Sequence, residues 1–162
     1  MKFGGTSVAD VDRIMAVRDI ISNEVENGWN VVAVVSAMSN ETNKLINLAK
    51  QVGIESLIDP EYDSLISTGE DISSSLLAIA LNSIGIPSRS WRGWQLPVRT
   101  DSFHSNAKIE EIKTEKLVET FKQGTKVAVV SGFQGIEKSG RITTLGRGGS
   151  DTSAVAIAAA ID

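Results

Sequence analysis

Apolar residues follow two periodicities that alternate along the chain. Short β-branched runs bounded by polar residues predict strands buried on both faces of a sheet. The clearest such runs cover residues 31–35 and 126–131, and shorter strands are expected at residues 1–3, 86–91 and 108–112. Between the strands, apolar residues recur every three or four positions and predict amphipathic helices over residues 8–27, 41–52, 67–84, 114–123 and 150–161.

The alternation of strands and helices indicates the fold class. This order favours a parallel or mostly parallel α/β sheet with helices on both faces. Ser7, followed three residues later by Asp10, predicts a capping box at the start of the first helix, and Gly28 predicts its end. A turn-rich stretch is expected before residue 108, and a glycine-rich loop from Gly132 to Asp151. The 162 residues suit a single domain.

Composition and charge exclude several classes of function. With 41% hydrophobic and 22% charged residues, the chain is typical of a globular protein. A net charge of −4 argues against nucleic-acid binding, which relies on many Lys and Arg residues. Cysteine is absent, so a disulfide framework, a thiolate zinc site and a cysteine nucleophile are excluded. The start of the chain lacks the apolar region of a secretory signal, and Ala154–Ile161 is too short to span a bilayer. We therefore expect a cytoplasmic protein with neither nucleic-acid nor membrane partners.

Three loops rich in glycine or hydroxyl residues follow expected strands, at Gly4–Ser7, Ser36–Asn40 and Gly132–Asp151. Ligands of open α/β sheets bind beyond the carboxyl ends of the strands, where glycine lets backbone N–H groups approach a phosphate. Any one of these loops alone is explained by chain turning, but the coincidence of all of them favours a phosphate site. The Walker A motif is absent, and a sequence that begins like G-x-G-x-x-G at Gly146 has Asp151 in place of the last glycine.

Four motifs of this chain occur in a characteristic order: KFGGTS at 2–7, VSAMSNETN at 35–43, STGE at 67–70 and TTLGRGGSDT at 143–152. Each motif alone is weak, but the ordered set resembles the aspartate kinases over essentially the whole chain. The resemblance implies a three-layer α/β/α sandwich of the amino-acid kinase (carbamate kinase-like) type. It also implies transfer of the ATP γ-phosphoryl group to the side-chain carboxylate of L-aspartate. The product would be 4-phospho-L-aspartate, at the first step toward lysine, threonine and methionine.

The resemblance implies roles for the residues on the phosphate side of the site. Lys2 would reach the transferring phosphoryl group, because phosphoryl transfer depends on positioning and charge neutralisation. Gly4, Gly5, Thr6 and Ser7 would bind the nucleotide phosphates, with ATP and Mg²⁺ as cofactors. Asp151 would have a catalytic role in organising Lys2 or Mg²⁺, and no residue is assigned as a direct metal ligand. A structural interpretation of Asp151, as an acidic residue in the first turn of a helix, stays open.

The resemblance also implies an amino-acid pocket. Arg147 would hold a carboxylate of aspartate through its planar guanidinium, and Glu70 would hold the ammonium group. Softer assignments are hydroxyl contacts from Ser36, Thr42 and Ser150 and a packing contact from Phe133. The substrate carboxylate is ionised at neutral pH, so no general base is required, which fits the lack of a catalytic triad. His104 is interpreted as structural or solvated, and Trp91 and Trp94 as packing or interface residues.

Members of the resembled family continue beyond the last helix, with a nucleotide-contacting segment like TDVDGVYT and regulatory ACT domains. Residues 1–162 are therefore expected to form a partial amino-acid kinase domain with an incomplete sheet. Such a domain invites homo-oligomerisation or association with a missing C-terminal half. Two alternatives stay open: a non-catalytic or split fragment that binds a ligand or a partner chain, and another amino-acid kinase such as a glutamate kinase.

Overall fold

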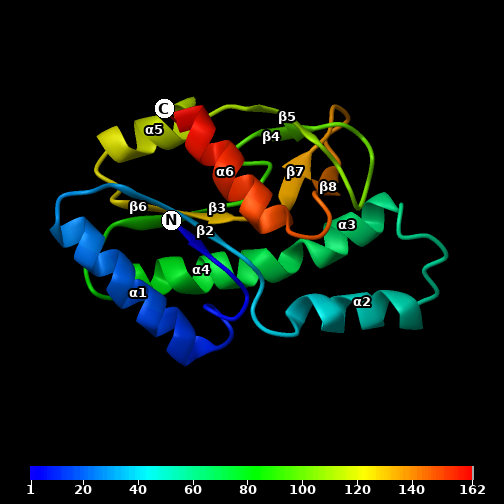
Figure 1. Cartoon of the computed structure of the whole chain (residues 1–162), viewed down its shortest axis with the longest axis horizontal. Coiled ribbons are helices and arrows are strands. Elements are labelled where there is room, and N and C mark those ends of the chain that lie inside the picture. Colours follow the sequence, from blue (N-terminus) through cyan, green and yellow to red (C-terminus); the bar gives the residue numbers. More distant parts are fainter. Residues whose placement is uncertain (162) are drawn as a thin grey trace.

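Strands and helices alternate along most of the chain, as the apolar pattern predicts. The computed structural model describes residues 1–161 (Figure 1). In chain order, the elements are β1 (Lys2–Phe3), α1 (Val11–Glu26), β2 (Val31–Val35), α2 (Glu41–Gln51), α3 (Pro60–Ile66), α4 (Thr68–Asn82), β3 (Ser88–Trp91), β4 (Val98–Thr100), β5 (Ile109–Ile112), α5 (Glu115–Lys122), β6 (Val127–Ser131), β7 (Gln134–Ile136), β8 (Ile142–Thr144) and α6 (Gly149–Ile161).

The main sheet is parallel throughout and has the strand order β1-β2-β6-β3. Its centre is formed by β2 and β6, which pair from Val31 with Val127 to Val35 with Ser131. The side chains of β6 are all buried, which explains the continuous β-branched run there. The prediction of a parallel sheet is confirmed.

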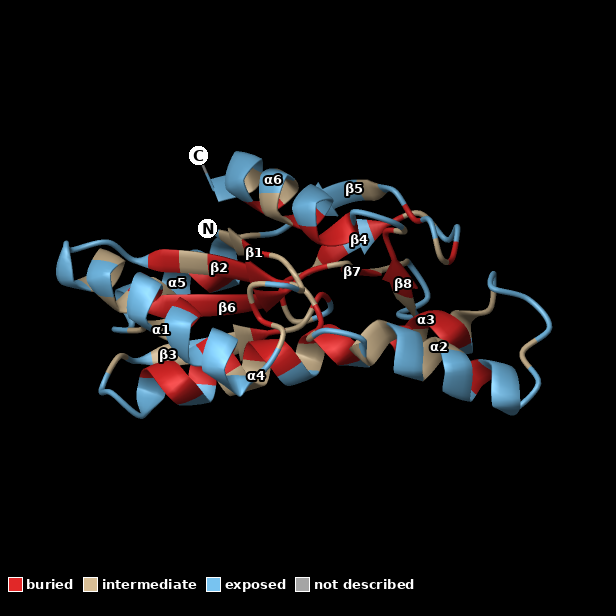
Figure 2. Ribbon diagram, turned by 60° about the horizontal axis from the view of Figure 1, so that its bottom comes forward, coloured by how far each residue is buried: buried red, intermediate tan, exposed pale blue. Residues whose placement is uncertain are grey.

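Two apolar layers cover this sheet and make it the middle of a three-layer sandwich (Figure 1). Val31, Ala33 and Val35 of β2 face α1 and α4, where they pack with Ile14 and Leu77. On the opposite face, the apolar cluster unites residues of β2, β3 and β6 with residues of α5, α6, β4 and the segment before β4: Val34, Trp91, Leu96, Val98, Leu117, Ala128, Val130 and Ile157. Figure 2 shows the central strands buried between helices with exposed outer faces. The predicted fold class is confirmed.

A second sheet of four short strands, in the order β5-β4-β7-β8, lies beside the sandwich. Its pairing is mixed: β4 pairs with β5 and β7 with β8 in antiparallel fashion, whereas β4 pairs with β7 in parallel. Only β5 was expected as a strand; β4, β7 and β8 lie in segments that the sequence pattern assigns to turns or loops. The prediction of a continuous loop over Gly132–Asp151 is therefore wrong, because β7 and β8 form a hairpin within it.

The start of α1 differs from the prediction. Its N-cap is Asp10, whose carboxylate accepts a hydrogen bond from the backbone N–H of Arg13 at 2.9 Å. Ser7 instead lies in the turn after β1 and donates its own N–H to the carbonyl of Gly4. The capping box at Ser7 is therefore wrong, because the chain completes a turn before it becomes helical. The predicted helix end is confirmed, since Gly28 follows the C-cap with a φ of +94°.

Two further observations concern the rest of the chain. The helix α3 was not expected, although its N-cap Asp59 and the following Pro60 form an ordinary helix start. None of the helices among residues 1–161 combines the length and apolar character needed to cross a membrane.

Candidate active site

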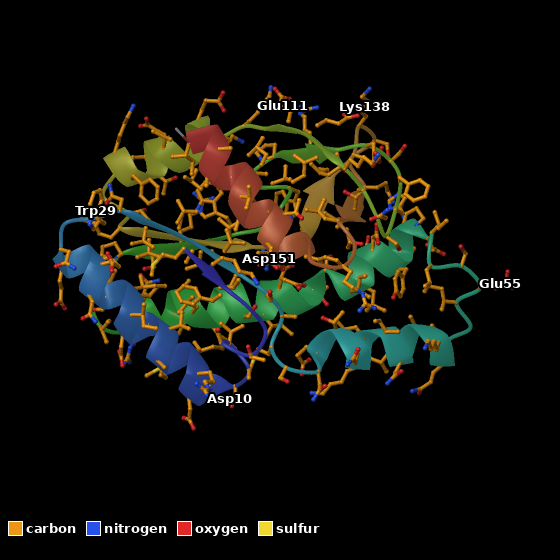
Figure 3. All side chains as sticks on the ribbon, in the orientation of Figure 1. Asp10, Trp29, Glu55, Glu111, Lys138 and Asp151 are labelled. Atoms are coloured by element: carbon orange, nitrogen blue, oxygen red, sulfur yellow. The ribbon has the colours of Figure 1, made fainter. Side chains whose placement is uncertain are left out.

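The loop after β1 and the N-terminus of α6 meet at the carboxyl end of the main sheet. The Nζ atom of Lys2 lies 2.8 Å from Oδ1 of Asp151, which stands in the first turn of α6. Figure 3 shows Asp151 at this end of α6 in the middle of the molecule, whereas the labelled Trp29 and Glu55 lie at its edges. The pair is partly open to solvent, because the Asp151 side chain is 71% exposed. It therefore combines a cation, a carboxylate and the positive end of a helix at one accessible point.

A cleft of about 220 Å³ opens at this point. Its walls come from separate parts of the chain that the sheet topology brings together: Lys2, Ser36, Thr42, Glu70, Phe133 and residues 146–151. The glycine Gly132 allows the close approach of α6, because a Cβ atom there would lie 2.8 Å from the Cβ of Ser150. The cleft is thus built by the sheet edge rather than by one local motif.

Glu70 is the buried charge of this cleft. It stands in the first turn of α4, and the residue is only 4% exposed. Its Oε1 accepts a hydrogen bond from the backbone N–H of Ala37 at 3.1 Å. The other oxygen, Oε2, is buried and has no hydrogen-bond partner among residues 1–161. Burial raises the pKa of Glu70 to about 7, opposed by the Ala37 hydrogen bond and assisted by the neighbouring charge of Asp71. A ligand cation at Oε2 would supply the missing partner.

Arg147 also lines the cleft. It stands between Gly146 and Gly148, whose positive φ angles of +74° and +76° shape the loop between β8 and α6. The residue is exposed and takes part in none of the ion pairs formed among residues 1–161. Its guanidinium is therefore available for an anionic ligand, while Glu70 offers a carboxylate oxygen to the same cleft.

Phe133 reaches the cleft from the segment between β6 and β7. Its φ angle is +69°, a conformation that is strained for a bulky residue and that the surroundings must therefore hold in place. Its N–H donates to Oγ of Ser153, and its carbonyl accepts from the N–H of Leu145. Strain of this kind clusters at functional sites, so it agrees with a ligand-facing role for the ring.

A second cavity of about 420 Å³ adjoins the cleft and shares Ser36, Thr42 and Glu70 with it. Gly5 and Thr6 contribute from the β1 loop, and the remaining lining comes from residues 37–40 and Asn43. The two cavities together extend past Lys2 along the carboxyl ends of β1 and β2. This arrangement leaves room for a small molecule beside a phosphate chain.

The structure brings together most of the residues that the sequence singles out. Those that line the cleft or the adjoining cavity are Lys2, Gly5, Thr6, Ser36, Thr42, Glu70, Phe133, Arg147, Ser150 and Asp151. Gly4 and Ser7 line neither, although a Cβ at Gly4 would lie 3.2 Å from the Lys2 Nζ. Their turn closes through the Ser7 N–H to the Gly4 carbonyl, so they shape the loop that presents Lys2 and Gly5. The ligand roles of all these residues stay predictions.

Comparison with known proteins shows the family. The family model described as "Amino acid kinase family" matches residues 1–162. The chain belongs to the amino acid kinase family. Among curated relatives, this family member is 50% identical over 160 residues to an aspartokinase of Bacillus sp. (strain MGA3) and 49% identical over 161 residues to an aspartate kinase of Pseudomonas fluorescens. Each match covers 99% of this chain, but the chain spans only 38% and 39% of the length of these relatives.

Solved structures agree with the fold. Aspartate kinase from Synechocystis has a TM-score of 0.80 and 43% identity, with 99% of this chain and 26% of that chain covered. Aspartokinase III of E. coli, solved in complex with aspartate and ADP, has a TM-score of 0.84 and 25% identity, with coverage of 99% and 46%. The resemblance to aspartate kinases that the four motifs indicate is confirmed.

Several features of the site carry no signal in the sequence. The backbone N–H that contacts Glu70 belongs to Ala37, which lies in a distant segment and is an ordinary residue type. His104, interpreted as structural or solvated, is 8% exposed and its Nδ1 lies 2.9 Å from Oδ2 of the buried Asp63. Trp91 is part of the core, as the packing interpretation expects, whereas Trp94 is half exposed.

No group of three or more His, Cys, Asp and Glu side chains that could hold a metal ion occurs within residues 1–161.

Proposed function

We propose that this amino acid kinase is an aspartate kinase, which transfers the γ-phosphoryl group of ATP to the side-chain carboxylate of L-aspartate. The observation that carries the proposal is the pairing of opposite charges across one small cleft. Glu70 presents a buried carboxylate oxygen without a partner, and Arg147 presents a guanidinium outside any ion pair among residues 1–161. A free α-amino acid carries both complementary groups. Relatives named aspartokinase that are about half identical over this chain support the choice of aspartate.

The chemistry follows from the position of Lys2. Its ammonium group stands beside the cleft and would neutralise charge on the transferring phosphoryl group. The aspartate side-chain oxygen attacks the γ-phosphorus, the bond from that phosphorus to the bridging oxygen breaks, and ADP leaves with the electron pair. The attacking carboxylate is already ionised at neutral pH, so no residue has to remove a proton. Catalysis then rests on placing both reactants and screening their charges.

Mg²⁺ fits this arrangement through Asp151. Magnesium is usually bound by one or two carboxylates together with substrate phosphates, and Asp151 is an exposed carboxylate beside Lys2. When bound, the ion would neutralise the phosphate oxygens. Asp151 would meanwhile hold Lys2 in the orientation that points its ammonium group into the cleft.

The test is ADP release by the purified protein supplied with Mg-ATP and L-aspartate, L-glutamate or no acceptor. We expect release that depends on aspartate. Faster turnover with glutamate would instead support the glutamate kinase alternative, whose substrate is longer by one methylene. No ADP release with any acceptor would support a fragment that binds ligand without turnover. The partial domain at residues 1–162, the cytoplasmic location and the association with itself or a C-terminal half stay predictions.

A further inference from the structure

A buried carboxylate lies behind the proposed amino-acid pocket without lining it. Asp63 of α3 is 0% exposed and forms part of neither cavity of the site. Every hydrogen bond that its carboxylate oxygens accept comes from two other segments. Thr144 donates from Oγ1 at 2.7 Å and from its backbone N–H at 3.0 Å, Ser105 donates from its backbone N–H at 3.0 Å, and His104 contributes Nδ1 at 2.9 Å. A carboxylate so deeply buried needs such a set of donors to replace the hydrogen bonds it would make to water.

These contacts place Asp63 between the two walls of the pocket. On one side, the carbonyl of Asp63 accepts the N–H of Ser67, the residue that joins α3 to α4 just before Glu70. On the other side, Thr144 ends β8 and leads directly into the loop that carries Arg147. The side chain therefore ties α3, which runs directly into the helix that presents Glu70, to the strand that leads into the loop that presents Arg147.

The segment around Ser105 extends this connection to the loop itself. The N–H of Ala107 donates to the carbonyl of Thr144 at 2.9 Å. At Gly146, which has a φ of +74°, a Cβ atom would lie 2.8 Å from Oδ1 of Asn106 and 3.1 Å from the carbonyl oxygen of Ser105, so the position favours glycine. Ser105 has a φ angle of +65°, which its hydrogen bonds to Asp63 help to hold. The start of the Arg147 loop thus packs against a segment that is hydrogen-bonded to Asp63.

We propose that Asp63 is a positioning residue for amino-acid specificity: its carboxylate sets the separation between Glu70 and Arg147. This inference rests on the proposed function, because it assigns those two residues to the two ends of the same amino acid. It does not give Asp63 a chemical step, since the side chain is closed off from both cavities. The ATP side of the site should be nearly independent of it, because Lys2 and Gly5 come from the β1 loop, which Asp63 does not contact.

The decisive variant is Asp63→Asn, which keeps the shape but turns an NH₂ group toward donors that need an acceptor. We expect the KM for aspartate to rise about tenfold or more, while the KM for ATP stays within about twofold. Thr144→Val removes one donor and should raise the aspartate KM by a smaller factor. Thr144→Ser keeps the hydroxyl and should leave that KM near the wild-type value.

Two control variants separate positioning from loss of stability. Glu61→Gln neutralises another α3 carboxylate, which pairs with Arg141 before β8 at the surface, and should leave both KM values unchanged. Ile66→Val removes a buried methyl group from α3 without touching the carboxylate. It should lower the melting temperature without raising the aspartate KM.

A second measurement does not depend on turnover. Hydrogen exchange of the amides in residues 143–148 should become about tenfold faster in Asp63→Asn than in Ile66→Val, under conditions where both are folded. An aspartate KM within about twofold of wild type, or unchanged exchange in this segment, would overturn the inference. Failure of the wild-type protein to use aspartate would instead overturn the proposed function, and the exchange result would still decide whether Asp63 positions the loop.

Discussion

Replacement of Glu70 by glutamine should make the protein more stable above neutral pH while it abolishes aspartate binding. The carboxyl group is buried, and burial raises its pKa from an ordinary value of 4.5 to about 7. A carboxyl group with a higher pKa in the folded state binds more protons when folded than when unfolded, between those two pH values. The free energy of unfolding of the wild type therefore falls as the pH rises from about 4.5 to about 7.

The size of this effect follows from the pKa difference. A pKa higher by about 2.5 in the folded state corresponds to about 3 kcal/mol of lost stability, complete above pH 7 and absent below pH 4.5. Glutamine does not titrate, and its Oε1 can keep the hydrogen bond from the N–H of Ala37. We therefore expect Glu70→Gln to exceed the wild type by up to about 3 kcal/mol in free energy of unfolding at pH 8, and to match it closely at pH 4.5.

Urea denaturation of the ligand-free protein at pH 4.5, 6, 7 and 8 measures this difference. Glu61→Gln is the matched control, because Glu61 is an exposed carboxylate and its replacement should leave the pH profile unchanged. Parallel stability profiles for wild type and Glu70→Gln would refute the reasoning, as would a variant that is less stable at pH 8. Protonation of Glu70 in the wild type should also weaken aspartate binding, by about tenfold for each pH unit below 7, because an uncharged Glu70 cannot pair with an ammonium group.

Three further substitutions test separate parts of the account. Asp151→Ala should lower kcat about 100-fold or more, with little change in melting temperature because the side chain is exposed; a normal kcat would remove Asp151 from the mechanism. Arg147→Ala should raise the aspartate KM about tenfold or more, and Arg147→Lys should recover only part of that loss, so an unchanged KM in steady-state kinetics would contradict the carboxylate role. Leu77→Ala, at a fully buried position between α4 and the sheet, should lower the free energy of unfolding by about 2–5 kcal/mol in urea denaturation; a loss below about 1 kcal/mol would contradict its place in the core.

The sheet could be predicted because its central strands are buried on both faces. Residues 31–35 and 127–130 had to be continuous apolar runs, and such runs are readable without tertiary information. The short strands β7 and β8 could not be recognised, since each has only three residues and the middle residue of β7 is Gly135. The true start of α1 at Asp10 was missed because Ser7 and Asp10 offer equally good local capping patterns, and only the turn after β1 decides between them.

The candidate site could be predicted in part for a similar reason. Lys2, Glu70 and Arg147 stand in motifs that mark the ends of strands or the starts of helices, so the sheet topology alone brings them to one edge. Asp63 and two of its hydrogen-bond partners, His104 and Ser105, stand in no such motif. The partners of Asp63 are ordinary residues more than forty positions away, and a buried carboxylate is visible only once its donors are in place.

The most direct test of the central claim is to identify the atom that receives the phosphoryl group. An acyl phosphate reacts with hydroxylamine to give a hydroxamate, so the protein is incubated with Mg-ATP, hydroxylamine and either L-aspartate or L-glutamate. The account predicts the β-hydroxamate of aspartate, formed in step with ADP, and little hydroxamate from glutamate. ADP release without hydroxamate, hydroxamate on the α-carboxylate, or a preference for glutamate would contradict it.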